Sequence, residues 1–140
     1  MLMYGIGVDY VEGIDWQNAV GMLKEFDEDL YSAFLDDLGT AYTADDIKEW
    51  FSNYESEGCY GIGAFLHDVI KEREFVDLDI DEPNGKMYLG ISANVPWNFA
   101  EPVKTFSKSD FHNMINRYIG MLTTEPVEIQ WWSISDETDW

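Results

Sequence analysis

Apolar residues recur along the chain at two periods, and the helical period dominates the first half. Between residues 15 and 38 they return every three or four positions, from Trp16 to Leu38, and Gly39 follows the last of them. This spacing predicts one long amphipathic helix over residues 15–38.

Two further helices are expected after it. Thr43 followed three residues later by Asp46 is a variant capping box, which predicts the start of a helix that ends before Gly58. A third apolar series with helical spacing covers residues 61–74.

The period then changes to two, which indicates strands. Over residues 76–81 three apolar residues alternate with three aspartates, as in a half-buried strand. The turn sequence of residues 82–85 and a second alternating run over residues 86–93 predict an antiparallel hairpin. Strands are also expected at residues 2–11 and 127–134, and a fourth helix, capped by Ser107 or Ser109, precedes the last strand.

These elements predict the fold class. The order is βαααββαβ, with no linker that divides the 140 residues, so we expect one domain over residues 1–140. Segregated helices and strands are typical of an α+β fold, here a small, mainly antiparallel sheet covered by helices.

Composition excludes several classes of function. The chain has 28 Asp and Glu against 8 Lys and Arg, a formal net charge of −20. Such a field repels nucleic acids and anionic lipid surfaces, so direct binding to either is not expected. The 46% of hydrophobic residues are enough for a core, and no apolar run is long enough to span a membrane.

The only cysteine and the first residues bear on the compartment. Cys59 cannot form an intramolecular disulfide, and the apolar start of the chain has no basic leader, since the first cation is Lys24. We therefore expect no secretion signal, a cytoplasmic protein and a buried Cys59.

The negative charge is concentrated in the first part of the sequence. Residues 1–82 carry 21 of the 28 acidic residues and four cations. If residues 15–38 form one helix, Glu25, Glu28, Asp29 and Asp36 lie on the face opposite the apolar stripe. Acidic residues in the second helix and the alternating aspartates of residues 76–81 add two further ridges.

The amount of charge approaches that of a nucleic acid. A compact chain of 140 residues has a diameter of roughly 37 Å. Duplex DNA carries about one charge per 1.7 Å, so 20 charges correspond to about 34 Å of duplex. Because self-repulsion of this size destabilises a compact protein, we expect the charge to serve association with a basic partner.

In size, acidity and acidic ridges the chain resembles a class of small proteins from bacteriophages and mobile elements. These proteins occupy the DNA-binding groove of a host defence enzyme, and they include anti-restriction proteins and many anti-CRISPR proteins. The resemblance implies a non-enzymatic DNA mimic without a cofactor, which inhibits a basic nucleic-acid-binding protein such as an RNA-guided nuclease in the host cytoplasm. It implies partner contacts through carboxylates and one aromatic anchor: Glu25, Glu28, Asp29, Asp36, Asp45, Asp46, Glu49, Asp77, Asp79, Asp81 and Trp97.

The spacing of residues gives less support to a calcium, zinc or phosphate-binding site. The alternating aspartates lack the Gly and the bidentate Glu of a calcium loop, since Glu82 and Tyr88 stand at those positions. His67 and His112 lie at no metal-ligand spacing with Cys59 or with each other, so no zinc site is expected. We expect His67 at the boundary of the core and His112 on the outer face of its helix. The paired glycines around Ile6 and Ile62 are interpreted as close-packing positions rather than phosphate loops.

Two other functional classes remain open. The first is an immunity-type or other interaction module that binds a basic partner through the hydrophobic loop of residues 96–99. The second is a hydrolase with divalent metal ions bound by carboxylates. In the last strand, alternation places Trp131 with Val127 and Ile129 in the core and leaves Trp132 the more exposed indole.

Overall fold

The computed structural model describes residues 2–92 and 108–133 of the chain. Their elements follow the predicted order in outline, and the fold is α+β. The helices and strands are β1 (Leu2–Gly7), α1 (Trp16–Phe26), α2 (Glu28–Leu38), α3 (Ala44–Ser52), β2 (Glu55–Ser56), β3 (Cys59–Tyr60), α4 (Ile62–Glu74), β4 (Asp79–Asp81), β5 (Tyr88–Ser92), α5 (Lys108–Gly120) and β6 (Gln130–Ser133).

The main sheet has four strands in the order β4-β5-β1-β6, and all neighbours are antiparallel. The predicted hairpin is confirmed as β4 and β5, which are joined by a 3₁₀ turn, Pro83–Gly85. Gly5 of β1 faces Gly90 of β5, and a Cβ atom on Gly5 would lie 2.6 Å from the Gly90 Cα. Close packing is therefore the role of Gly5, as the sequence indicated.

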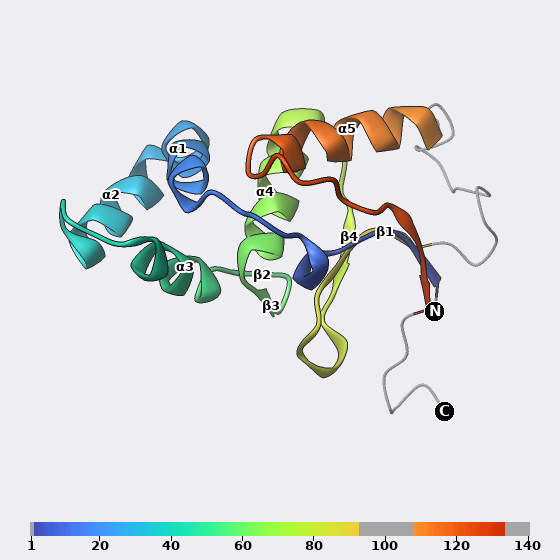
Figure 1. Cartoon of the computed structure of the whole chain (residues 1–140), viewed down its shortest axis with the longest axis horizontal. Helices are drawn as coiled ribbons and strands as arrows, with labels where there is room; N and C mark the ends of the chain where they lie inside the picture. Colours follow the sequence, from blue (N-terminus) through green and yellow to red (C-terminus); the bar gives the residue numbers. More distant parts are fainter. Residues whose placement is uncertain (1, 93–107, 134–140) are drawn as a thin grey trace.

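The helices form two groups around α4 (Figure 1). α1, α2 and α3 lie together on one side of α4, and the sheet and α5 lie on the other. Aromatic rings join the groups: the ring centroids of Phe51 in α3 and Phe65 in α4 are 5.1 Å apart. On the sheet side, buried Ile6 and Leu89 belong to the same hydrophobic cluster as Phe111 of α5. One continuous core thus supports both groups.

The long first helix that we predicted is wrong, because the chain divides it at Asp27. This residue has an extended backbone, with φ −156° and ψ 108°, and ends α1. Its carboxylate accepts hydrogen bonds from the backbone N–H groups of Asp29 and Leu30, at 2.9 and 3.2 Å. An N-cap of this kind satisfies the free N–H groups at the start of α2 and so favours a new helix over continuation of the old one.

Several other boundaries also differ. β1 ends at Gly7, where a 3₁₀ turn over Val8–Tyr10 begins, and β4 and β6 are shorter than expected. The small hairpin of β2 and β3 was not predicted; its turn has Glu57 and Gly58 at φ 53° and 77°, as a tight hairpin requires. The predicted loop with Trp97 lies outside the described residues.

The capping box that predicted the second helix is present. The Thr43 Oγ1 atom accepts from the Asp46 N–H at 3.2 Å, and the Asp46 carboxylate accepts from the Thr43 N–H at 2.8 Å. None of the helices in the described part of the chain is both long and apolar enough to cross a membrane.

Candidate functional site

The α1–α3 group carries a dense negative charge. We call residues 15–53 the acidic lobe; they contain ten Asp and Glu and only two cations, Lys24 and Lys48. The described segment 108–133, in contrast, contains three acidic residues and two cations. Residues 54–92 contain nine acidic residues and three cations, so the acidity extends beyond the lobe and is lowest in segment 108–133. Eight of the ten acidic side chains in the lobe are exposed: Asp15, Glu25, Glu28, Asp29, Asp36, Asp37, Asp45 and Glu49.

Five of the predicted partner-binding residues are exposed carboxylates of this lobe with no hydrogen bond or ion pair to another described residue. Asp36 precedes Asp37 in the sequence, and Glu49 precedes Trp50. The Trp50 indole N–H donates a hydrogen bond to Asp37 Oδ2 at 3.0 Å. This hydrogen bond joins the last turns of α2 and α3, which contain Asp36 and Glu49. The five residues are Glu28, Asp29, Asp36, Asp45 and Glu49.

Two of the predicted residues in the lobe have structural contacts. Glu25 does not continue the ridge of α2, because α1 ends at Phe26; it forms a surface ion pair with Arg73 of α4 at 3.4 Å. Asp46 is half-buried, and its carboxylate caps α3. The single four-residue ridge predicted on one long helix is therefore wrong.

The three alternating aspartates, Asp77, Asp79 and Asp81, do not form a row of exposed, unengaged carboxylates either. Asp77 precedes β4, and its carboxylate contacts His67 Nε2 at 3.2 Å and Lys71 Nζ at 3.7 Å. Asp81 is half-buried and accepts a hydrogen bond from the Glu82 N–H at 2.9 Å. Asp79 is exposed at the end strand of the sheet.

His67 is a buried residue of α4 and not a boundary residue as predicted. Its side chain is 1% exposed, and each ring nitrogen contacts a carboxylate: Nδ1 lies 2.9 Å from Asp68 and Nε2 lies 3.2 Å from Asp77. The spacing from Gly63 to His67 to Ile70, all buried, is that of one helix face, so the sequence did contain a signal for its burial.

Asp68 is the centre of this polar network. It accepts hydrogen bonds from Tyr54 Oη and Ser56 Oγ, each at 2.6 Å, in addition to its contact with His67. Burial alone would raise the pKa of Asp68, but these hydrogen bonds outweigh it and lower the pKa below its ordinary value. Burial and the bond to Asp68 raise the pKa of Tyr54. The network joins the end of α3, β2 and α4.

His112 and Cys59, the two other side chains considered for a metal or catalytic site, are held within the fold. His112 is not on an outer face: its Nε2 lies 2.5 Å from the hydroxyl of buried Tyr4. Cys59 is buried, as predicted, and burial, with the nearby Glu82 and Asp81, raises the pKa of its thiol. A protonated, buried thiol is a poor nucleophile.

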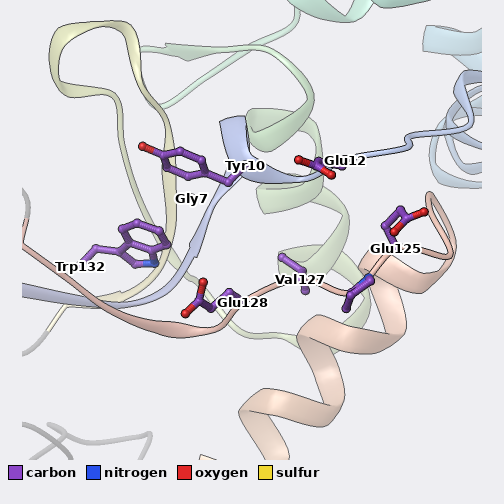
Figure 2. Close-up of a pocket in the computed structure, with 8 residues that line it drawn as sticks. Gly7, Tyr10, Glu12, Glu125, Val127, Glu128 and Trp132 are labelled. Atoms are coloured by element: carbon purple, nitrogen blue, oxygen red, sulfur yellow. The ribbon is translucent and has the colours of Figure 1, made fainter.

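A pocket of about 440 Å³ opens between the end of β1 and the segment that leads into β6. Figure 2 shows Tyr10 and Trp132 at one end and Glu12 and Glu125 toward the other, with Glu128 near Val127 between them. The lining residues come from two distant parts of the sequence: Gly7, Tyr10, Glu12, Glu125, Pro126, Val127, Glu128 and Trp132.

The aromatic wall of this pocket is fixed by several contacts. The rings of Tyr10 and Trp132 are stacked, with centroids 5.5 Å apart and planes 3° from parallel. The Trp132 indole N–H donates to the Gly5 carbonyl at 2.9 Å. Trp131 packs against the core as predicted, but Trp132 is also partly buried because it is held on β1.

The described residues contain no group of three His, Cys, Asp or Glu side chains arranged to hold a metal ion. The chain matches no family model, no curated protein and no solved structure.

Proposed function

We propose that the protein is a non-enzymatic inhibitor that mimics the charge of a nucleic acid and occupies the basic groove of a bacterial defence nuclease, such as a CRISPR effector or a restriction enzyme, in the host cytoplasm. The observation that supports this proposal is the acidic lobe: ten carboxylates against two lysines within residues 15–53, eight of them exposed.

Exposed carboxylates can take the place of phosphates toward arginine and lysine. Charge-assisted hydrogen bonds of Arg to a carboxylate have the same bidentate geometry as those to a phosphate. The carboxylates of Glu28, Asp29, Asp36, Asp45 and Glu49 form no hydrogen bond or ion pair within the described chain, so a partner can bind them without breaking such a contact.

The field of the lobe also favours fast association with a basic groove. Surfaces of one sign raise association rates with a partner of the opposite sign, and the effect decreases with ionic strength. An immunity protein that neutralises a toxic nuclease would use the same surface, and it would differ in its target. We assign no catalytic role to the buried His67 network, since a side chain that is 1% exposed does not meet a substrate from solution.

The test is direct binding to purified bacterial nucleases. A panel of restriction endonucleases and RNA-guided nucleases is immobilised, and the affinity of the protein is measured in 0.05 and 0.5 M NaCl. Binding of a labelled target duplex to the same nucleases is measured with and without the protein. We expect one nuclease to bind the protein, to lose its duplex, and to bind at least about tenfold more weakly in high salt.

Charge reversal identifies the contact surface. Asp36→Lys and Glu49→Lys reverse exposed carboxylates of the lobe, and Glu72→Lys makes the same change at an exposed position of α4. The first two variants are expected to lose inhibition, while Glu72→Lys retains it. Equal inhibition by all three, or the absence of any bound nuclease, contradicts the proposal.

A further inference from the structure

We propose that the pocket of Figure 2 binds the guanidinium group of an arginine side chain from the basic partner; this inference rests on the proposed function and assigns a second contact outside the acidic lobe.

The pocket has a rigid aromatic wall. Trp132 is held by its hydrogen bond to Gly5 and by Tyr88, whose ring centroid is 5.3 Å away. Gly7 makes room for the wall, since a Cβ atom there would lie 2.6 Å from the Tyr10 ring. The rings are therefore in place before a ligand arrives, which lowers the entropic cost of binding.

The charged residues that line the pocket are all acidic. Glu12, Glu125 and Glu128 are exposed, and none of them forms a hydrogen bond or ion pair through its carboxylate with another described residue. The lining residues include no Lys or Arg. Anionic ligands such as nucleotides are excluded by this field, and a cation is favoured.

The combination of an exposed tyrosine, Tyr10, and separate carboxylates fits a guanidinium group better than other cations. Guanidinium is planar, stacks on aromatic faces and has five N–H donors, so it can contact a ring and carboxylates together. A divalent metal ion needs several oxygen ligands at about 2.0–2.6 Å, and the described residues form no such group. Lys86 Nζ lies 5.8 Å from the centroid of the Tyr10 ring, so a guanidinium group that stacks on this ring displaces the lysine.

Charge complementarity identifies the source of the arginine. A protein that grips phosphates presents arginines on its surface, and a pocket of about 440 Å³ has room for such a side chain together with part of its backbone. The partner's arginine is therefore the occupant that we infer.

The chemistry of the pocket is tested without the nuclease. The probe is N-acetylarginine amide, and the signal is the indole N–H resonance of Trp132 in ¹⁵N-labelled protein, identified with Trp132→Phe. We expect a saturable shift with a Kd on the order of 1 mM. N-acetylcitrulline amide has the same shape without charge and is expected to cause no saturable shift.

Two matched variants separate the pocket from general electrostatics. Glu125→Gln/Glu128→Gln removes two exposed pocket carboxylates and is expected to raise the Kd of the probe about tenfold. Asp36→Asn/Glu49→Gln removes the same charge from the acidic lobe and should leave that Kd within about twofold in 0.15 M salt. Circular dichroism checks that both variants fold. Equal effects of the two variants, or saturation by the citrulline compound, overturn the inference.

Binding to the nuclease then tests whether an arginine of the partner occupies the pocket. The Glu125→Gln/Glu128→Gln variant should bind the nuclease found above about tenfold more weakly. Unchanged affinity for the nuclease, or tighter binding of spermidine than of the arginine probe, overturns the inference while the proposed function stands. If no nuclease binds the protein, the proposed function fails, whatever the probe does.

Discussion

His67 and Asp68 are adjacent in sequence, and the Nδ1 atom of the buried His67 lies 2.9 Å from Oδ1 of the half-buried Asp68. Side chains of adjacent helical residues usually point in different directions, so a direct contact between them is uncommon. It is possible because Asp68 is turned toward Tyr54 and Ser56, which donate to the same carboxylate.

The Asp68→Asn variant should be less stable than the wild type by about 1–3 kcal/mol, because hydrogen bonds to a partly buried charge are lost or weakened. Urea denaturation at pH 7 measures the difference. Glu72→Gln removes the same charge from an exposed site on the same helix and should change the free energy of unfolding by less than about 0.5 kcal/mol. Similar losses in both variants would show that the network does not stabilise the fold.

The difference in unfolding free energy between the wild type and Asp68→Asn should become smaller at low pH. The pKa of Asp68 is lowered in the folded state, so its stabilising effect is complete above the unfolded value of about 3.9 and is lost as the pH falls through the folded value. The gap in unfolding free energy between wild type and Asp68→Asn should therefore shrink as the pH falls below about 4. A gap that stays constant down to pH 3 contradicts the lowered pKa.

Charge reversal at the two ends of α2 should have opposite effects. Asp29 lies in the first turn, where the helix dipole favours a negative charge, while Asp36 lies near the end, where α2 has no basic residue. Both Asp29→Lys and Asp36→Lys reduce the net charge equally, so the general relief of repulsion cancels in the comparison. Asp36→Lys should be the more stable by about 1 kcal/mol in thermal or urea unfolding, and the reverse order would contradict the assigned ends of α2.

Alanine substitution of Gly5 and Gly21 should have opposite effects on stability, because the space around the two residues differs. A Cβ atom on Gly5 would meet the backbone of β5, at 2.6 Å from the Gly90 Cα, so Gly5→Ala should cost about 3 kcal/mol or more. Gly21 lies in α1 with no atom within 4 Å of such a Cβ, and Gly21→Ala should stabilise the protein by about 0.5–1 kcal/mol. Thermal unfolding of the two variants measures both; a tolerated Gly5→Ala would show that β1 and β5 are farther apart.

The thiol of Cys59 should react slowly in the folded protein. It is 6% exposed, and burial and nearby carboxylates raise its pKa, so little thiolate forms at pH 8. Labelling with a disulfide reagent at pH 8 should be at least about tenfold slower than in 6 M urea. Equal rates would mean that the β2–β3 region opens readily.

Much of the fold could be predicted from the periodicity of the sequence. The hairpin of β4 and β5, the capping box at Thr43 and the helices α4 and α5 follow from local patterns that the structure retains. The break at Asp27 was missed because the apolar spacing continues across it. The N-cap chemistry of Asp27 interrupts the backbone without a change in that spacing.

The candidate site could be predicted only in part, because charge is a property of composition and contacts are not. Exposed acidic residues of α2 and α3 were expected and are present. The contact of Asp46 with Thr43 is local and follows from the capping box, whereas the contacts of Asp77 depend on His67 and Lys71 of α4. The pocket joins Tyr10 to Trp132, which are 122 positions apart in sequence and become neighbours only when β1 and β6 pair. No local pattern contains that information.

β4 stands at the end of the sheet, and no strand of the described chain pairs with its outer edge. An open edge is a template on which a strand of another molecule can add, and charged residues oppose that addition. Two of the three residues of β4 are aspartates, so two copies brought edge to edge would place four carboxylates together. The same acidity thus opposes edge-to-edge aggregation of the sheet.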